Sequence, residues 1–360
     1  MTRPRISFFG SSLVSAYWNG AATYYRGIIR ALHERGYDVT FYEPDAYERQ
    51  QHRDIPDPDW ARVVVYAPTD EGVARAFEDG SSADIVIKTS GVGIFDELLE
   101  AAVASHRRPG SLSIFWDVDA PATLDRVTVN PADPFRPLIP RFDLILTYGG
   151  GEPVTSAYAR LGARVCVPIY NALDPSTHYP VERASRYRAH LALLANRLPD
   201  REARIEEFFL KAARLLPDRR FLLGGNGWAD KHMPGNVVYT GHVFTRDHNA
   251  FNSTPLALLN VSRESMARYG YSPATRVFEA AGAAACLITD AWVGLEEFLE
   301  PDTEVLVASD GDEVAELVRG LTPARARAIG DAARARVLAD HTYARRVGQL
   351  ESLLAVPSAA

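Results

Sequence analysis

The sequence predicts an α/β protein of two doubly wound, Rossmann-like domains in tandem, facing a cleft. The chain has 360 residues, which is more than one ordinary core holds. Short apolar, β-branched runs alternate with amphipathic stretches, as in a parallel sheet covered by helices on both faces. The alternation stops at residues 170–188, rich in Pro, Asn, Asp and Ser, and then restarts. We therefore expect an N-terminal domain at 1–172, a C-terminal domain at 173–340, and a helix within 341–360 that packs back on the N-terminal domain.

Seven apolar runs in the first half of the chain predict strands, because β-branched residues fit a buried, pleated surface. These runs are residues 5–9, 38–42, 62–66, 84–88, 111–116, 143–147 and 164–169. Two amphipathic stretches between them, residues 21–35 and 94–105, predict helices.

The second half repeats the pattern with six further strand candidates. These are residues 190–195, 220–223, 236–240, 256–261, 286–289 and 304–307. Helices are expected at residues 202–215, 273–282 and 312–321, and the tail at 323–355 is rich in Ala and Arg and predicts a helix. Ligands of such sheets bind at the carboxyl ends of strands, so the loops there are where we look for function.

Composition excludes several classes of function. The net charge of −7 argues against a nucleic-acid partner, which needs clustered cations. The two cysteines, Cys166 and Cys286, lie in apolar runs and form no disulfide framework or zinc spacing, which is typical of a reducing compartment. The N-terminus does not resemble a signal peptide, and no apolar stretch is long enough for a transmembrane segment. The sequence thus predicts a cytoplasmic protein.

The most informative motif is a predicted helix start in the second half. Ser272 is expected as the N-cap and Pro273 as the first helical residue. A helix start after a strand presents free N–H groups and a positive dipole end, so Thr275 and Arg276 there suit a phosphate group. Glu279 follows one turn later, where its carboxylate can accept the two ribose hydroxyls of a bound nucleotide; the alternative is a charge on the helix surface.

Two arginines follow the first strand of the second domain. Arg197 and Arg201 lie in the expected strand-to-helix loop, and the guanidinium group suits bidentate contact with phosphate. The alternative is that one of them is a solvated residue that pairs with Asp200 or Glu202.

Three more loops of this domain carry candidate ligand-binding residues. Glycine permits close backbone approach, so Gly225 and Gly241 can border a nucleotide, although either also fits an ordinary turn. His242 could line a base pocket, but a lone histidine is more often structural. The remaining candidates are Arg263, as a further cation, and Gly294 with Glu296, which suit sugar hydroxyls.

In the first domain, Asp117 and Asp119 follow a predicted strand. An aspartate there can act as a general base or hold an acceptor hydroxyl. The Asp-x-Asp spacing is also found in metal sites, but two carboxylates are weak evidence for one, and we expect no metal. The first strand is not followed by G-x-G-x-x-G, which argues against a dinucleotide-dependent oxidoreductase.

Together these motifs resemble the CgeB-type (spore maturation protein-like) branch of the group 1 glycosyltransferases. The C-terminal half carries the resemblance in LLANRLPDREARIEEFF, RFLLGGNGWAD, NVVYTGHV, LLNVSRESMARYGYSPATRVFEAAGAAACLITDAWVGLEEFLEP and HTYARR. The N-terminal half matches more loosely, through FFGSSLVSAYWNGAATYYR, FWDVDAPAT and IPRFDLILTYGGG. The resemblance implies a GT-B fold, a nucleotide-diphosphate sugar as donor in the C-terminal domain, an acceptor in the N-terminal domain, and a retaining, metal-independent transfer without a cofactor.

By this resemblance, Glu279 matches the ribose-binding glutamate of the E-x7-E motif, and Arg197 matches the phosphate-binding arginine. The chain departs from the family at two positions. Tyr271 stands where the first glutamate would be, eight residues before Glu279, and Glu202 stands where a lysine usually follows the arginine. Arg197 and Arg201 would then neutralise the leaving diphosphate, and Asp119 or Asp117 would orient the acceptor.

Alternatives of other classes remain open. The two departures fit a non-catalytic protein that binds nucleotide sugars, and the same fold supports sugar-nucleotide epimerases. The alternating pattern also fits periplasmic-binding-type proteins and some dehydrogenases, because architecture alone does not settle function.

Overall fold

The computed structural model describes residues 3–17, 19–106 and 108–354. The chain divides into two compact units. Unit 1 comprises Met1–Tyr170 with Tyr343–Ala360, and unit 2 comprises Asn171–Thr342. Residues 170–188, the stretch that interrupts the sequence pattern, belong to unit 2 except for Tyr170.

Unit 1 is built on one seven-stranded sheet in which every strand pair is parallel. Its order is β3-β2-β1-β4-β5-β6-β7, so the direction of winding reverses between β1 and β4. The strands are β1 (Arg5–Phe9), β2 (Asp38–Pro44), β3 (Arg62–Tyr66), β4 (Ile85–Thr89), β5 (Leu112–Asp117), β6 (Leu144–Thr147) and β7 (Cys166–Pro168). β4 lies at the centre, and all five of its residues are buried, as expected of a strand covered on both faces.

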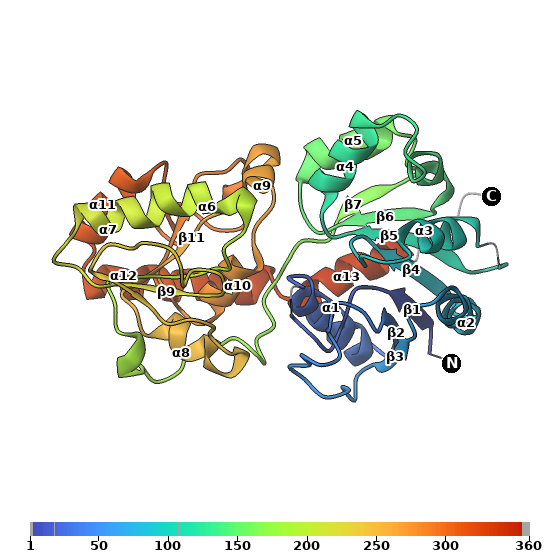
Figure 1. The fold of residues 1–360 in the computed structure, drawn as a ribbon, viewed down its shortest axis with the longest axis horizontal. Coiled ribbons are helices and arrows are strands. Elements are labelled where there is room, and N and C mark those ends of the chain that lie inside the picture. Colours follow the sequence, from blue (N-terminus) through green and yellow to red (C-terminus); the bar gives the residue numbers. More distant parts are fainter. Residues whose placement is uncertain (1–2, 18, 107, 355–360) are drawn as a thin grey trace. The chain divides into compact units, whose positions relative to one another are not determined.

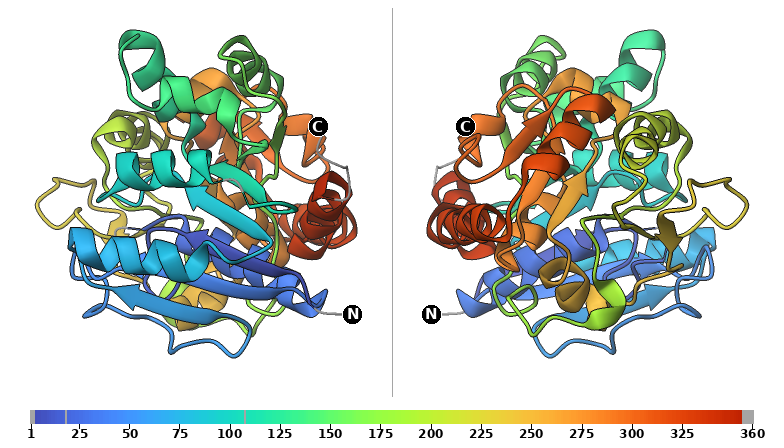
Figure 2. Two further views of the ribbon diagram at one scale, coloured as in Figure 1. Left: turned by 90° about the vertical axis from the view of Figure 1, so that its right-hand side faces the viewer. Right: turned by 90° about the vertical axis from the view of Figure 1, so that its left-hand side faces the viewer.

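Helices cover both faces of this sheet. They are α1 (Ala22–Glu34), α2 (Asp70–Gly80), α3 (Asp96–Ser105), α4 (Ala120–Val129), α5 (Gly151–Arg160) and α13 (Tyr343–Leu354), with the short 3-10 helix η1 (Arg136–Arg141). The C-terminal α13 packs against α1 (Figure 1), and Figure 2 shows it on the opposite side of the sheet from α2 and α3. The ring of Tyr343 lies directly over Gly27, where an added Cβ would come within 2.1 Å of it.

Unit 2 is built on a six-stranded sheet, again parallel throughout. Its order is β10-β9-β8-β11-β12-β13, so the winding reverses between β8 and β11. The strands are β8 (Leu191–Leu194), β9 (Phe221–Gly224), β10 (Val237–Tyr239), β11 (Ala257–Asn260), β12 (Leu287–Asp290) and β13 (Leu306–Ala308).

The helices of unit 2 form two layers. They are α6 (Pro199–Ile205), α7 (Lys211–Leu215), α8 (His248–Ser253), α9 (Glu264–Tyr269), α10 (Thr275–Gly282), α11 (Gly311–Gly320) and α12 (Pro323–Asp340). The short elements are η2 (Ser185–Tyr187), η3 (Glu206–Leu210), η4 (Thr245–Asp247) and η5 (Leu295–Glu297). Figure 1 shows α6, α7 and α11 on one side of the sheet and α8 on the other. The core between the sheet and the first layer includes Phe209, Leu223 and Ile288, all fully buried.

Two predicted helices differ from the structure. The helix expected at residues 202–215 begins earlier, at Pro199, and contains a π-helical turn at η3. The tail expected as one helix is two, because the chain leaves helical geometry at His341, whose backbone N–H still bonds to Val337. Ala355, the last residue of that prediction, lies outside the described residues.

The predicted fold class is confirmed. The chain forms two parallel, doubly wound sheets, and their strands alternate with helices along the sequence. Among the described residues, no helix is long and apolar enough to cross a membrane.

Candidate functional site

The candidate residues of unit 2 gather at one edge of its sheet. Arg197 follows β8, Gly225 follows β9, Gly241 follows β10, Arg263 follows β11 and Gly294 follows β12. Since all these strands run parallel, their carboxyl ends meet at the same edge. The structure thus brings together loops that lie far apart in the sequence.

Ion pairs connect the loops on the two sides of the winding reversal, which lies between β8 and β11. Arg263, after β11, pairs with Asp200 at the start of α6, with Nε and Oδ2 2.6 Å apart. Arg204 of α6 reaches Glu264 of α9 at 3.3 Å. Ligands of doubly wound sheets bind at this switch point, because the loops on its two sides diverge there.

Arg197 is held by two carboxylates. Its Nε and one terminal nitrogen donate to Glu202, each at 2.8 Å, and its other terminal nitrogen donates to Asp230 at 3.0 Å. The hydrogen bonds with Glu202 and Asp230 raise the pKa of Arg197 above its usual value. A phosphate that makes a bidentate contact with this guanidinium would therefore compete with these carboxylates.

Glu202, at the position where the resemblance implies a lysine, has a lysine as its own partner. Lys231, from the loop after β9, donates to Glu202 at 2.8 Å and also pairs with Glu206. Hydrogen bonds from Arg197 and Lys231 lower the pKa of Glu202 to about 2. The sequence analysis did not identify Lys231, because it reaches Glu202 from another loop.

Arg204 is a second cation that the sequence analysis missed. It donates to the backbone carbonyl of Ser262 at 3.1 Å and to Asp290, which is fully buried, at 2.7 Å. Asp290 also accepts from the backbone N–H of Ser262 at 3.0 Å. Arg204 stands one helical turn after Arg201, which is the signal that could have included it in the cationic group.

The predicted cap of α10 is wrong. The helix begins at Thr275, and the hydroxyl of Ser272 donates to the carbonyl of Gly270 at 2.9 Å instead of capping. The side chain of Asn171 fixes this start: its amide donates to the carbonyl of Pro273 at 3.1 Å and its oxygen accepts from the Thr275 hydroxyl at 3.0 Å. Ala274, with extended backbone at φ −65° and ψ 148°, takes the N-cap position in place of Ser272.

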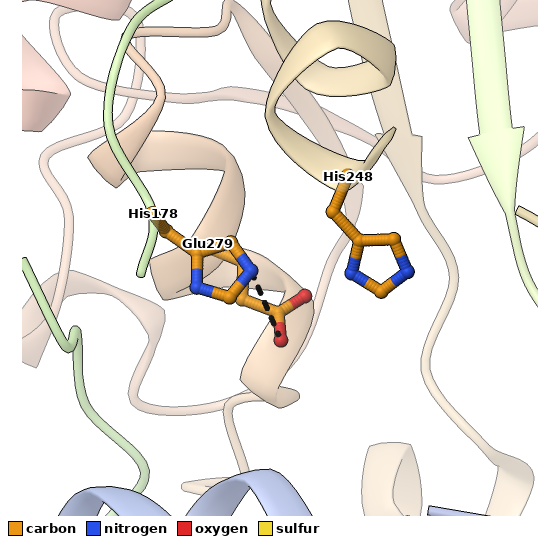
Figure 3. A group of neighbouring side chains, drawn as sticks. All are labelled: His178, His248 and Glu279. Carbon is orange, nitrogen blue, oxygen red and sulfur yellow. Dashed lines mark ion pairs between the residues drawn. The ribbon is translucent and has the colours of Figure 1, made fainter. Parts of the chain in front are cut away.

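Glu279 is buried one turn into α10, where the sequence analysis placed a functional carboxylate. Its oxygens lie 3.4 Å from a terminal nitrogen of Arg276 and 3.8 Å from His178 Nε2 (Figure 3). Burial would raise the pKa of Glu279, but the positive charges around it, chiefly that of Arg276, hold the pKa at about 2. The carboxylate is therefore ionised at neutral pH.

His248, the third member of this group, faces the same carboxylate (Figure 3). Burial, with the nearby charge of Arg276, lowers the pKa of His248 to about 4. Its imidazole is thus neutral at pH 7. Arg276 also donates to Asn252 at 3.1 Å, which fixes its guanidinium beside Glu279.

Tyr271, at the position of the missing glutamate, packs on Gly294. Tyr271 has a positive φ of 46°, and its N–H donates to the carbonyl of Val293 at 2.7 Å. A Cβ on Gly294 would lie 2.2 Å from the tyrosine ring. This packing accounts for the glycine, while Glu296, on η5, is exposed.

Gly225 allows the loop after β9 to lie close to the loops after β8 and β10. A Cβ there would lie 2.1 Å from the carbonyl oxygen of Ala195, and its N–H donates to the carbonyl of Gly241 at 2.8 Å. His242 is exposed beside them, with its ring edge-on to Phe244. Gly225 thus has a structural reason independent of any ligand, and Gly241 has a positive φ of 70°, which favours glycine.

In unit 1, Asp117 is the last residue of β5, and its carboxylate is held by neighbouring groups. It is fully buried, and it accepts from the hydroxyl of Tyr158 at 2.5 Å, from Thr123 at 3.1 Å and from the N–H of Asp119 at 3.0 Å. Burial raises its pKa. Its observed role is to hold the turn that carries Asp119, which is half-buried at the N-cap position of α4.

Unit 1 also contains an open hollow that the sequence analysis missed. Its volume is about 460 Å³, and its lining residues are Tyr17, Tyr47, Glu48, Arg49 and Gly93. They come from the loops after β1, β2 and β4, around the point where the winding of this sheet reverses. Only the topology brings these loops together, so no local motif could have indicated the hollow.

A family model matches part of the C-terminal half of the chain. Residues 201–352 match the glycosyl transferase-like family. The matched segment includes α10 with Arg276 and Glu279. No curated protein matches the chain in sequence.

Solved structures match almost the whole chain. Sucrose-phosphate synthase from Thermosynechococcus elongatus has a TM-score of 0.71 at 15% identity, with 98% of this chain and 99% of that chain covered. HepE from Anabaena, in complex with UDP and glucose, has a TM-score of 0.70 at 13% identity, with the same coverage. An alpha-glucosyltransferase in complex with UDP has a TM-score of 0.71 at 10% identity, covering 98% of this chain and 100% of that chain. At these identities the likeness shows the shared GT-B fold.

Proposed function

We propose that the protein is a glycosyltransferase of the CgeB-like branch, which moves a sugar from a nucleoside-diphosphate donor to an acceptor with retention of configuration. One observation carries the proposal. Glu279 is a buried, ionised carboxylate in the segment that matches the glycosyl transferase-like family. A buried carboxylate that remains ionised can accept hydrogen bonds from two hydroxyl groups, and the ribose of a nucleotide has two such hydroxyls.

UDP-sugars are the donors to test first. Two structural neighbours, HepE and the alpha-glucosyltransferase, are in complex with UDP. The donor would lie along the carboxyl edge of the second sheet, with ribose at Glu279 and diphosphate near the arginines that follow β8 and β11.

Transfer requires that the charge developing on the leaving diphosphate be neutralised. Arg197 and Arg263 come from the loops at the winding reversal, and Arg201 and Arg204 lie beside them on α6, not in the loop where Arg201 was expected. We propose that these side chains supply that charge without a metal cofactor. Arg197 and Arg263 would then exchange their carboxylate partners for phosphate oxygens. Each guanidinium has an anionic partner before and after the exchange, so the exchange by itself favours neither the free nor the bound state.

For the acceptor, we propose the hollow of unit 1, with Asp119 as the residue that orients a hydroxyl. The tyrosine faces that line it, 36% exposed at Tyr17 and 52% at Tyr47, suit stacking against a sugar ring or another flat group. Tyr47 is fixed in place, since its hydroxyl donates to the carbonyl of Gly93 at 2.8 Å.

A specific observation favours a second candidate, a protein that binds nucleotide sugars without transferring them. The guanidinium of Arg197 already donates hydrogen bonds to two carboxylates, those of Glu202 and Asp230. If this pairing persists with ligand bound, the leaving diphosphate lacks its main positive partner, and chemistry would be slow while binding persists.

Turnover separates the candidates. UDP-sugars are incubated with the protein and a panel of sugar and lipid acceptors, and released UDP is measured by chromatography. We expect acceptor-dependent UDP release in the wild type and a loss of about 100-fold in Arg197→Ala. Equal release by the variant contradicts the role of Arg197. Binding without release favours the non-catalytic candidate, and an isomerised donor without acceptor reveals an epimerase.

A further inference from the structure

Two histidines converge on Glu279 from separate segments of unit 2. His178 lies in the segment that precedes β8, His248 is the first residue of α8, and Glu279 belongs to α10. One ligand atom of each lies within 4.8 Å of the others (Figure 3). Since His178 and Glu279 are 6% and 7% exposed, the group is nearly closed to bulk solvent.

In each of the three side chains, the polar atom that points away from the centre of the group has a partner of its own. His178 Nδ1 lies 3.0 Å from the hydroxyl of Thr177, and His248 Nε2 donates to the carbonyl of Val243 at 3.2 Å. Glu279 Oε2 lies 3.4 Å from Arg276, while Oε1 faces His178. Outer contacts of this kind orient metal ligands and fix their tautomers, and they leave His178 Nε2, His248 Nδ1 and Glu279 Oε1 for the centre.

We propose that these three atoms bind one transition-metal ion of the zinc type, and that this ion excludes the nucleotide. Two imidazoles and one carboxylate are a ligand set that zinc accepts, with a fourth position left for water. Ligands of a tetrahedral zinc lie about 3.4 Å apart, given bonds of about 2.0–2.1 Å. His178 Nε2 and Glu279 Oε1 are 3.8 Å apart, and all three ligand atoms lie within 4.8 Å of one another, so the group must close by at most about 1.4 Å around the ion.

The exclusion rests on the proposed function, in which Glu279 binds the ribose. One carboxylate oxygen pair cannot hold both the ion and two ribose hydroxyls, so metal and donor compete. The ion would therefore inhibit and not assist transfer. Because Arg276 places a positive charge beside the same carboxylate, we expect weaker binding than in a structural zinc site.

The site itself is tested without nucleotide. Chelator-treated full-length protein is titrated calorimetrically with Zn²⁺, and with Co²⁺ as a spectroscopic probe. We expect one ion per chain, and no binding of Mg²⁺ there, because Mg²⁺ prefers oxygen ligands. His248→Gln and His178→Gln should weaken Zn²⁺ binding at least about tenfold. The matched control is His232→Gln, which removes an exposed histidine outside the group.

Circular dichroism and Tm without metal establish that each variant is folded. If Zn²⁺ binds the wild type and both variants with equal affinity, or does not bind the wild type, the site is disproved. His248→Gln serves as the second variant if His178→Gln, at a more buried position, fails to fold.

Competition is measured as the ratio of UDP affinities with and without Zn²⁺. UDP also chelates zinc in solution, but equally for wild type and His248→Gln, so the difference between their ratios reports the site. At a zinc concentration about ten times its Kd, we expect about tenfold weaker UDP binding in the wild type only. Equal ratios would overturn the exclusion. Failure of UDP to bind without metal would contradict the proposed function and the exclusion, while the metal site would still stand on its own titration.

Discussion

At the scale of single residues, the candidate site is governed by carboxylates that already have partners. Glu202 and Asp230 hold Arg197, Asp200 holds Arg263, and Arg276 holds Glu279. The pairs of Arg197 and Arg263 are partly exposed, and exposed ion pairs contribute little to stability, so their exchange for a ligand costs little. The ionic state of each group therefore bears on ligand binding more than on folding.

Glu202→Gln should strengthen UDP binding. The change removes the carboxylate that competes with phosphate for Arg197, and we expect an affinity about threefold or more higher by calorimetry. The matched control is Glu316→Gln, an exposed carboxylate on α11. Weaker binding in Glu202→Gln would mean that Glu202 positions Arg197 for the ligand.

Glu100 predicts a pH-dependent stability in unit 1. Burial raises its pKa from 4.5 to about 7, although Lys88 and Arg126 oppose the shift. The folded state then holds a proton that the unfolded state has lost, so this contribution is complete below pH 4.5 and disappears as pH rises through 7. Glu100→Gln should match the wild type in acid and be more stable above pH 7, by at most about 3 kcal/mol.

Urea unfolding of wild type and Glu100→Gln between pH 4 and 8 measures that difference. Glu97→Gln on the same helix is the control, because Glu97 is exposed. A difference that does not vary with pH would show that Glu100 is ionised throughout.

At the scale of elements, the start of α10 depends on a side chain distant in sequence. Asn171 bonds to both Pro273 and Thr275 and so takes the place of a local cap. Local rules for helix starts favour Ser272, and they fail because they do not include partners about one hundred residues away. The cluster of His178, His248 and Glu279 was not predictable from local sequence patterns, because its members come from separate segments of the chain.

Asn171→Ala should therefore destabilise the protein and weaken nucleotide binding together. Two hydrogen bonds of a fully buried amide are lost, for about 1–3 kcal/mol. Thermal unfolding and UDP titration measure the two effects. Asn130→Ala removes one exposed side-chain hydrogen bond, from the N–H of Ala132 in unit 1, and should leave the UDP affinity unchanged. Lost stability with intact UDP affinity would separate Asn171 from the site.

At the scale of the whole molecule, the strands were predictable and the sites only in part. Apolar runs such as residues 5–9 and 62–66 coincide with β1 and β3, because a doubly covered sheet needs continuous apolar strands. The loops carrying Arg197 and Arg263 were predictable from their place after strands. The break at His341 and the hollow at Tyr47 were not, because tertiary packing and strand order determine them.

The tail helix gives a prediction for the whole chain. Gly27→Ala places a methyl group within 2.1 Å of the ring of Tyr343, so α13 must shift away from α1. We expect a loss of about 1–3 kcal/mol and faster proteolysis of the tail. Gly20→Ala is the control, since nothing lies within 4 Å of its added Cβ. Equal proteolysis of both variants would contradict the docking of α13 on α1.

The most direct measurement of the central claim is a calorimetric titration of UDP into the wild type, Glu279→Gln and Glu316→Gln. The substitution at Glu279 keeps the shape of the side chain and removes only its charge. We predict that the wild type and Glu316→Gln bind UDP alike, and that Glu279→Gln binds at least about tenfold more weakly, as expected for loss of charge-assisted hydrogen bonds. Unchanged affinity in a folded Glu279→Gln variant, or no binding by the wild type, would contradict the assignment of a nucleotide-sugar site at the carboxyl edge of the second sheet.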